Sequence, residues 1–339
     1  MKTAIVILNW NGAHHLEQFL PILLKHTSSA MGAVYVADNG STDHSVALLE
    51  DKFKEVRIIR FDKNYGFAGG YNRALAQIEA DYYVILNSDV EVTENWLSPL
   101  IDYLEHHQDA AACQPKILSY HNRNHFEHAG AAGGFIDYLG YPFCRGRILA
   151  HVEEDKGQYD TIRDVFWASG ACLVIRAAIF HQTGGFDDDF FAHMEEIDLC
   201  WRLRSRNHRI VCIPQSKIYH VGGGTLQVEH PQKTYLNFRN NLLMLYKNLP
   251  SSRLFFILLM RFFLDYLAVF QLLITGKPKN AWAVLQARMA YRKMRPLFKQ
   301  KRRTNLESAT NPHIPEIILK SIIVNYYLKG KKIFRELIE

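Results

Sequence analysis

The fold is decided by the stretch Asp81-Tyr82-Tyr83-Val84-Ile85-Leu86-Asn87-Ser88-Asp89-Val90-Glu91-Val92. Its apolar run from Tyr82 to Leu86 predicts a buried strand, which ends at Asn87-Ser88-Asp89 before a helical pattern expected from Thr93. Ligands of open α/β sheets bind at the carboxyl ends of the strands. A carboxylate there, such as Asp89, can hold a divalent cation against a diphosphate, because hard cations prefer oxygen ligands. Asn, Ser and Asp are also common turn residues, so this triplet alone allows a plain turn.

Three units of the same kind precede this stretch. In each unit an apolar run typical of a strand ends in polar residues, and apolar residues at helical spacing follow. The strands are expected at Thr3 to Leu8, Ala33 to Ala37 and Val56 to Phe61. Four strands that alternate with helices predict an α/β fold with a mostly parallel, right-handed sheet, whose loops gather at one edge.

Polar residues end all four strands: Asn9, Asp38, Asn64 with Gly66, and Asn87 with Asp89. The Asp38 carboxylate can accept a hydrogen bond from the imide N–H of uracil or thymine. The glycines from Gly66 to Gly70 can let main-chain amides and a helix amino terminus approach a phosphate or a ribose. Asp38 can also form an Asx-turn or a helix cap, and the glycines a plain loop. The four features together favour a nucleotide pocket.

This pocket is not of a common type. No Gly-x-Gly-x-x-Gly follows the first strand, and the chain has no Gly-x-x-x-x-Gly-Lys-Ser/Thr. Both a nicotinamide-dependent dehydrogenase and a P-loop NTPase are therefore disfavoured.

The middle of the chain has a looser pattern. From Asp109 to Tyr159 we expect irregular structure with no assigned role, and a strand follows at Cys172 to Ile175. An acidic block then lies between Gly184 and Leu203, where the apolar spacing predicts a helix with an acidic start that the helix dipole favours. These carboxylates can be caps and solvated charges. Alternatively, one of them faces the sheet edge and takes a proton from an attacking hydroxyl.

A histidine, His220, ends a further short strand before Gly222-Gly223-Gly224. A single histidine is more often structural than a ligand. Here its imidazole can complete the coordination of a metal held by Asp89, because neutral imidazole suits manganese and other transition metals.

The composition restricts the class of protein. With 339 residues, of which 48% are hydrophobic, the chain can bury a substantial core. Five scattered cysteines without a Cys-x-x-Cys pair disfavour a disulfide framework and a zinc knuckle, and predict buried thiols in a reducing compartment. The amino terminus carries no apolar leader, so we expect a cytoplasmic protein. Ten basic and no acidic residues lie between Lys277 and Arg303, which predicts an anionic partner for that segment.

In their order and spacing, these motifs resemble those of the family-2 glycosyltransferases of GT-A fold, in the bacterial rhamnosyltransferase-like branch. The resemblance covers about Thr3 to Pro250. It rests on Val6 to Gly12, Asp38 to Asp43, Asn64 with Gly66-Phe67-Ala68 and Asn72, Asn87-Ser88-Asp89, Gly184-Gly185-Phe186-Asp187, Glu195 to Leu199, His220, and Arg239-Asn240. It implies a Rossmann-like GT-A catalytic domain at 1–250 and leaves a helical, basic, membrane-associating extension at 251–339.

The resemblance also implies a role for each matching residue. Asp38 would bind the base of a UDP- or dTDP-sugar, with a rhamnose-like donor favoured, and Asp89 and His220 would hold Mn²⁺ or Mg²⁺. The remaining donor-binding residues would be Asn9, Asn11, Asn64, Gly66, Phe67, Asn72, Asn87 and Ser88. The acidic pair before Ile197 would supply the base that activates the acceptor hydroxyl, with inversion at the anomeric carbon.

Two residues depart from the family pattern. Asn87 replaces the first Asp of the DXD-type motif, which leaves a metal with less protein charge. Glu196 stands where the usual Glu-Asp pair has Asp, so the base is Glu196, with its longer reach, or Glu195, and we favour Glu196. The Gln-x-x-Arg-Trp signature of processive synthases is absent, so we expect transfer of a single sugar.

The carboxy-terminal arm contains an apolar stretch, Leu254 to Thr275, that is long enough to span a bilayer. Arg261 and Asp265 lie near its middle, and charges at bilayer depth are costly. We therefore prefer a helix in the membrane interface or packed on the catalytic domain, with 254–303 contacting anionic lipids; a single span at 254–275 remains the alternative. A nucleic-acid partner is disfavoured, because no nucleic-acid-binding module is recognised.

The sequence thus predicts a metal-dependent, inverting glycosyltransferase at the cytoplasmic face of the inner membrane, with a lipid-linked or cell-surface glycan acceptor. One alternative is a non-catalytic nucleotide-sugar-binding protein, which the Glu at position 196 keeps open. A sugar-phosphate nucleotidyltransferase is a weaker alternative, because Asn9-Trp10-Asn11-Gly12 does not supply the glycine-rich basic loop it needs.

Overall fold

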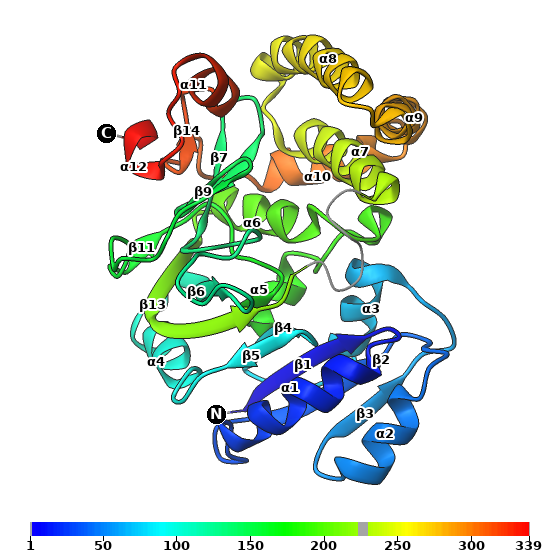
Figure 1. Cartoon of the computed structure of the whole chain (residues 1–339), viewed down its shortest axis with the longest axis vertical. Coiled ribbons are helices and arrows are strands. Elements are labelled where there is room, and N and C mark those ends of the chain that lie inside the picture. The colour runs from blue at the N-terminus through cyan, green and yellow to red at the C-terminus, as the bar shows by residue number, and fades with distance from the viewer. Residues whose placement is uncertain (1, 223–229, 339) are drawn as a thin grey trace.

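A mixed nine-stranded sheet forms the centre of the computed structural model, which describes residues 2–222 and 230–338 (Figure 1). The strands run in the order β3-β2-β1-β4-β12-β6-β13-β11, and β5 pairs with β13. Their bounds are β1 Thr3–Asn9, β2 Ala33–Asp38, β3 Arg57–Arg60, β4 Tyr82–Asn87, β5 Val90–Val92, β6 Ala110–Ser119, β11 Arg163–Asp164, β12 Cys172–Arg176 and β13 Arg209–His220.

A second, smaller sheet lies beside it in the order β10-β9-β8-β7-β14. Its strands are β7 Gly134–Asp137, β8 Pro142–Cys144, β9 Arg147–Ile148, β10 His151–Val152 and β14 Ile317–Ile318. The helices are α1 Ala13–Lys25, α2 Ser45–Lys52, α3 Gly66–Leu75, α4 Ser98–His106, α5 Ala177–Gln182, the short 3₁₀ turn η1 Asp188–Phe190, α6 Glu195–Ser205, α7 Pro231–Asn248, α8 Ser251–Ile274, α9 Pro278–Met294, α10 Phe298–Ser308, α11 Ile322–Leu328 and α12 Phe334–Ile338.

The first four strands are parallel, as predicted. β1 pairs with β2 and β4, and β2 pairs with β3. The register sets Asn9 beside Asp38 and Leu8 beside Asn87. The polar ends of these strands therefore meet at one edge of the sheet, and the predicted α/β architecture with a helical carboxy-terminal region is confirmed.

Both faces of the sheet are covered because side chains alternate along each strand. On β1, Ile5 and Ile7 pack in one apolar cluster with Leu16 and Leu20 of α1. Val6 faces the opposite cluster, which includes the helices α3 and α6. Strands buried on both faces explain the continuous apolar runs of the sequence.

The prediction of irregular structure from 109 to 159 was wrong for the strands that lie there, above all β6. Residues Ala110–Ser119 form β6, which lies between β12 and β13 inside the large sheet. Gln114, Pro115 and Lys116 hide the strand pattern. The buried Lys116 amine lies 2.8 Å from the Asp155 carboxylate, so its charge is compensated inside the protein.

The helix expected from Thr93 begins only at Ser98. Val90–Val92 instead forms β5, which pairs antiparallel with the end of β13 and sets His220 opposite Val90. This pairing brings His220 next to Asp89. The block Gly223-Gly224-Thr225, which follows His220 in the sequence, lies outside the described residues.

The five cysteines are free and buried, as predicted. Burial in the core raises the pKa of the Cys113 and Cys172 thiols. Neither thiol is therefore a reactive nucleophile at neutral pH.

Helices α7 to α10 gather at one end of the molecule, where α8 lies outermost (Figure 1). The two charges near the middle of α8 point inward, because Arg261 and Asp265 are 2% and 0% exposed. Asp265 accepts hydrogen bonds from both Arg261 and Arg288 of α9. In the described part of the chain, α8 is the one helix long and apolar enough to cross a membrane.

Candidate active site

The base-binding residue predicted at the end of β2, Asp38, is buried. Its carboxylate accepts a hydrogen bond from the Asn9 side chain at 3.2 Å and another from the Ser41 amide at 3.0 Å. The second contact is a local bond from the side chain to the backbone three residues on, one residue farther than in the Asx-turn that the sequence allowed. The buried Asn9 Oδ1 has no hydrogen-bond partner in the described residues, so this corner of the site retains an unused acceptor.

A residue that the sequence did not single out, Asn39, joins the next loop to this corner. Its side-chain amide donates to Asn64 Oδ1 at 3.0 Å and to the Gly66 carbonyl at 3.1 Å, and its Oδ1 accepts from the Tyr65 amide. Asn39 is 2% exposed. It therefore fixes the loop after β3 against the loop after β2.

The glycine stretch after Asn64 is not a loop. Gly66–Leu75 is the helix α3, and its first amides, those of Phe67 and Ala68, donate to the Phe191 carbonyl at 2.6 and 3.2 Å. Gly66 has φ +74°, and a Cβ there would lie 2.5 Å from the Phe191 oxygen. The glycine is thus required by close packing, and the two amides are not free donors for a phosphate.

Two of the predicted donor-binding asparagines hold loops together. The Asn72 side chain donates to the Phe186 carbonyl at 2.8 Å and accepts from the Phe186 amide at 2.9 Å. Asn11 Oδ1 accepts from the Thr42 amide at 2.7 Å. Both contacts give these asparagines a structural role at the rim of the site.

The predicted metal ligands Asp89 and His220 do meet. Asp89 Oδ1 lies 3.1 Å from His220 Nε2, and the Asn87 side-chain nitrogen lies 3.4 Å from the same nitrogen. On the other side of the ring, Glu127 Oε2 lies 3.5 Å from His220 Nδ1. The side chains of Asp89, His220 and Glu127 are all buried.

This arrangement sets the charge of the imidazole. Burial alone would lower the pKa of His220, but the carboxylates of Asp89 and Glu127 outweigh burial and raise it to about 10. Burial alone would likewise raise the pKa of Asp89, but the facing His220 lowers it. Without a metal, the pair is therefore an imidazolium held by carboxylates at neutral pH.

Asp89 and His220 can supply only part of the ligands that a divalent cation needs. The described residues contain no group of three His, Cys, Asp or Glu side chains that could hold a metal ion. One carboxylate oxygen and one imidazole nitrogen match an ion that takes its other ligands from substrate phosphates and water. Glu127 behind the ring is the carboxylate that often orients a ligating histidine.

The acidic pair stands at the start of α6, where a helix dipole favours negative charge. Glu195 is 4% exposed, and Oε2 of both Glu195 and Glu196 is buried without a hydrogen-bond partner in the described part of the chain. Burial raises the pKa of Glu196 to about 7. Burial and the neighbouring Glu196 raise the pKa of Glu195 well above its usual value.

The backbone before this pair is strained. Phe191, His193 and Met194 have φ values of 64°, 69° and 73°, which cost side-chain-bearing residues about 1–3 kcal/mol each. Asn240 of α7 holds this segment, because its side-chain amide donates to the carbonyl oxygens of Phe190, Ala192 and His193. The Arg239-Asn240 motif thus fastens the segment that carries the acidic pair.

The other carboxylates of the acidic block are structural. Asp198 is fully buried and accepts from Lys247 at 2.8 Å and from Arg202 at 3.0 Å. Asp187 accepts from Lys247 and Lys301, which outweigh burial and lower its pKa to about 2. These ion pairs join α6 to α7 and α10.

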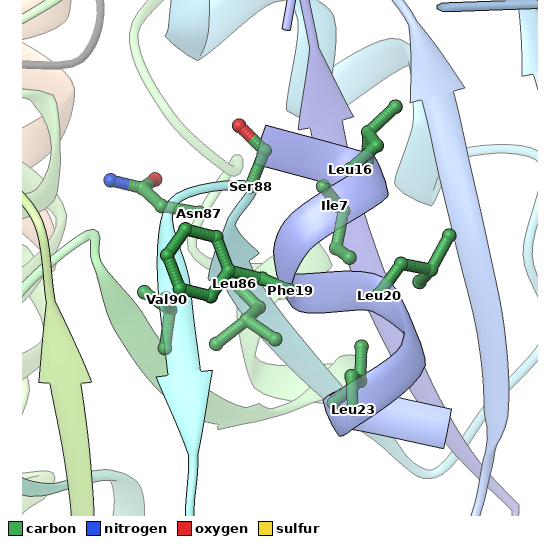
Figure 2. Close-up of a pocket in the computed structure, with 9 residues that line it drawn as sticks. All are labelled: Ile7, Leu16, Phe19, Leu20, Leu23, Leu86, Asn87, Ser88 and Val90. Carbon is green, nitrogen blue, oxygen red and sulfur yellow. The ribbon is translucent and has the colours of Figure 1, made fainter. Parts of the chain in front are cut away.

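Beside Asn87 and Ser88, a small apolar pocket lies between α1 and the ends of β1 and β4 (Figure 2). Leu16, Phe19 and Leu20 project into it, whereas the polar ends of Asn87 and Ser88 lie at its rim. Its apolar walls do not suit a nucleotide. The pocket is a small gap in the packing of apolar side chains beneath the site.

Two further side chains near the site escaped the sequence analysis. His15 of α1 lies close enough to Asp89 for the two charges to interact, although burial lowers the pKa of His15. Lys233 of α7 likewise lies close enough to Glu127 for the two charges to interact. A possible signal for His15 was its place in the first turn after β1, directly above the sheet edge.

The model of the family described as "Glycosyl transferase family 2" matches residues 5–184. The match covers more than half of the chain and includes Asp38 and Asp89. This chain belongs to glycosyl transferase family 2. It is therefore a glycosyltransferase, and the predicted family is confirmed.

Named relatives agree with this assignment. The N-acetylglucosaminyl-diphospho-decaprenol L-rhamnosyltransferase of Mycobacterium tuberculosis is 28% identical over 231 residues, which are 64% of this chain and 75% of that protein. The rhamnosyltransferase WbbL of Escherichia coli is 24% identical over 199 residues, 56% of this chain and 72% of that protein. The hexosyltransferase Agl10 of Haloferax volcanii is 24% identical over 246 residues, 71% and 74% of the two chains. The enzyme is accordingly of the hexosyltransferase type.

Solved structures share the fold. TarS residues 1–349 of S. aureus, in complex with UDP-GlcNAc, matches with a TM-score of 0.54 at 16% identity, over 91% of this chain and 89% of that chain. The mannosyltransferase PcManGT of Pyrobaculum calidifontis, in complex with GDP-Man and Mn²⁺, matches with a TM-score of 0.52 at 12% identity, over 97% and 88%. At these identities the likeness shows the GT-A fold alone.

Proposed function

We propose that this enzyme transfers one sugar, with inversion and with a divalent metal, from a UDP- or dTDP-sugar to a lipid-linked glycan acceptor. A rhamnose-like donor is favoured, because two of the named relatives are rhamnosyltransferases and one acts on a decaprenol-linked diphosphate by its name. The observation that carries the proposal is the acidic pair Glu195 and Glu196, whose Oε2 atoms are buried and have no hydrogen-bond partner in the described residues.

On the donor side, Asp38 and Asn9 would bind the base, next to the polar end of β1. Asn39 would keep the loops after β2 and β3 in place around it. The arrangement requires no rearrangement of these side chains, because Asn9 and Asp38 already contact each other at 3.2 Å.

On the acceptor side, Glu196 would take the proton of the attacking hydroxyl. The hydroxyl oxygen then forms a bond to the anomeric carbon, while the bond from that carbon to the diphosphate oxygen breaks and the diphosphate leaves with the electron pair. A base with a pKa near 7 suits this step, because a substantial fraction of it is ionised at neutral pH and it is still basic enough to accept a proton.

Asp89 and His220 would hold Mn²⁺ or Mg²⁺, which when bound neutralises charge on the departing diphosphate. Glu127 would keep the His220 ring oriented from behind. Asn87 stands in place of a carboxylate and adds no negative charge, so the diphosphate itself would supply most of the remaining ligands.

For location, we propose peripheral attachment at the cytoplasmic face of the inner membrane through α8 and the basic segment after it. The division into a catalytic part, 1–250, and an extension, 251–339, belongs to this proposal. The helix α8 supports it, because its inward face carries both of its central charges. Of the ten basic residues in 277–303, Arg288, Lys301, Arg302 and Arg303 bond to groups of the protein itself. The anionic lipids would meet the exposed side chains of Lys279, Arg292, Lys293 and Lys299.

The test is donor turnover by the purified enzyme with UDP- and dTDP-sugars, with and without Mn²⁺ or Mg²⁺. A thermal-shift screen first selects the donor, since a ligand raises stability by RT ln(1 + [L]/Kd). Transfer to a short-chain polyprenyl diphosphate glycan, with NMR of the product anomer, then checks the acceptor and the inversion. A protein that binds a nucleotide sugar but neither hydrolyses nor transfers it would contradict the proposal and favour a binding role.

A further inference from the structure

The outward face of α8 is largely apolar and uncharged from Leu254 to Ile274. Large side chains exposed on it are Phe255, Phe256, Leu259, Phe263, Tyr266, Leu267, Phe270, Leu273 and Ile274. The buried residues Ile257, Arg261, Asp265 and Val269 recur every four positions on the opposite face. Between Leu254 and Ile274 the exposed surface therefore carries no charge.

A second group of exposed apolar residues lies on and beside α11. Leu319, Tyr327 and Leu328 are 77%, 59% and 80% exposed. Exposed lysines flank them at 320, 329 and 332. The sequence analysis placed the lipid-binding residues at 254–303 and did not include this segment.

The two groups lie at the same end of the molecule (Figure 1). One turn, between β7 and β8, connects them. The Leu139 carbonyl in this turn accepts from Arg261 of α8 at 3.2 Å, and the Asp137 carboxylate accepts from the Ile322 amide of α11 at 3.0 Å. The Tyr138 amide also donates to Ile318 at 2.9 Å. The turn thus holds α8 and α11 in a fixed relation.

Charge complements this apolar surface. Residues 251–339 contain 17 basic and 5 acidic residues, whereas the whole chain has a net charge of +6. The extension is therefore strongly basic, and the rest of the chain is acidic. An apolar face flanked by lysines matches a bilayer with anionic headgroups, which attract each lysine near the surface.

We propose that Leu319 to Lys332 is a second membrane-contact element, which together with α8 forms one face that lies on an anionic bilayer. This inference rests on the membrane location proposed above for α8. The lipid chains would cover Leu319, Tyr327 and Leu328, and anionic headgroups would meet Lys329 and Lys332. A second copy of this chain is the competing occupant of the same face.

Flotation of the full chain with vesicles tests this inference. One set of vesicles contains phosphatidylcholine alone, and the other contains phosphatidylcholine with phosphatidylglycerol. The wild type should float with the anionic set. The variant Tyr327→Ser with Leu328→Ser should bind these vesicles at least about tenfold more weakly, because two large apolar side chains no longer leave water. The variant Lys329→Glu with Lys332→Glu should lose binding to the anionic set.

The matched control is Ile162→Ser, which removes an exposed apolar side chain next to β11 and should leave flotation unchanged. A further variant, Phe255→Ser with Phe263→Ser, tests α8 separately. Donor hydrolysis in solution, without lipid, should be the same in all these proteins, which shows that they are folded.

The possible outcomes separate the proposals. Binding that depends on the α8 residues but not on Tyr327 and Leu328 overturns this inference and leaves α8 as the membrane element. Failure of the wild type to float overturns both membrane proposals. A dimer in light scattering that the Tyr327→Ser, Leu328→Ser variant dissociates, without vesicle binding, assigns the face to a second copy. Glycosyl transfer is measured in a separate assay, so the result for the proposed function is independent of the result for membrane binding.

Discussion

Asn240 Nδ2 lies 2.7 Å from the main-chain carbonyl oxygen of His193, the residue that precedes Met194 and the acidic pair. The same nitrogen also donates to the Phe190 and Ala192 carbonyls, so one buried amide group holds three carbonyl oxygens of a strained segment. The position of Glu195 and Glu196 therefore depends on a side chain of another helix.

The variant Asn240→Ala should lower kcat by about 100-fold, because a displacement of about 1 Å at a reacting group costs that much, while the KM for the donor changes little. Steady-state kinetics with separate donor and acceptor series measures this split. The matched control is Asn305→Ala, which removes a buried asparagine that donates to Asn248 and should lower only the thermal stability. Equal loss of kcat in both variants would show that Asn240 has no special positioning role.

The variant Glu196→Gln should reduce kcat by a factor of about 100 to 10,000, the usual contribution of a general base, with donor binding retained. Glu195→Gln is the paired variant that decides between the two candidates. If Glu195→Gln is the more damaging and Glu196→Gln is nearly active, the base is Glu195. Calorimetric titration with the nucleoside diphosphate checks that both variants still bind the donor half.

The pH dependence of kcat/KM follows from the same residue. Burial raises the pKa of Glu196 to about 7, so the base is protonated and inactive below that pH and ionised above it. The rate should therefore rise with pH and level off above about 7. Stability changes in the opposite direction, because a carboxyl with a raised pKa destabilises the fold as pH rises through the window from 4.5 to about 7. Glu196→Gln should remove that loss of stability.

Metal binding should depend on Asp89 and, through the imidazole, on Glu127. Thermal shifts with Mn²⁺ and a nucleoside diphosphate should disappear in Asp89→Ala. In Glu127→Gln the metal affinity should fall by about 10- to 100-fold, as for other carboxylates behind a ligating histidine. Asp43→Asn, at a carboxylate that bonds to Ser45 away from the histidine, is the control. An unchanged metal-dependent shift in Asp89→Ala would show that the metal assignment is wrong.

Local signals were sufficient for much of the fold. Apolar runs that end in polar residues predicted β1 to β4 and their common edge, because each strand carries its own pattern. The pattern of β6 was not recognisable from the sequence. The charge of Lys116 can be buried in this strand only because Lys116 pairs with Asp155, which lies in another segment. Glycines between Gly66 and Gly70 indicated a loop because their packing neighbour, Phe191, is distant in sequence.

Part of the site was also predictable, namely the residues that local patterns indicate. Asp89 and His220 were paired correctly, as one residue followed a strand and the other ended one. Glu127 could not be found, because its role comes from the fold of a region without a clear pattern. The structural contacts of Asn11 with Thr42 and of Asn72 with Phe186 could not be predicted, because they depend on loops from other segments, and the role of both residues in donor binding stays a prediction.

The Phe191 carbonyl, which receives the amides of Phe67 and Ala68, belongs to the segment that ends at the acidic pair. The proposed donor side and the proposed acceptor side of the enzyme are therefore joined at this peptide group, in addition to the contacts of Asn72 with Phe186. Replacing Gly66 by a larger residue would push this group away, and the damage would appear as slow deprotonation of the acceptor rather than as weak binding of the nucleotide.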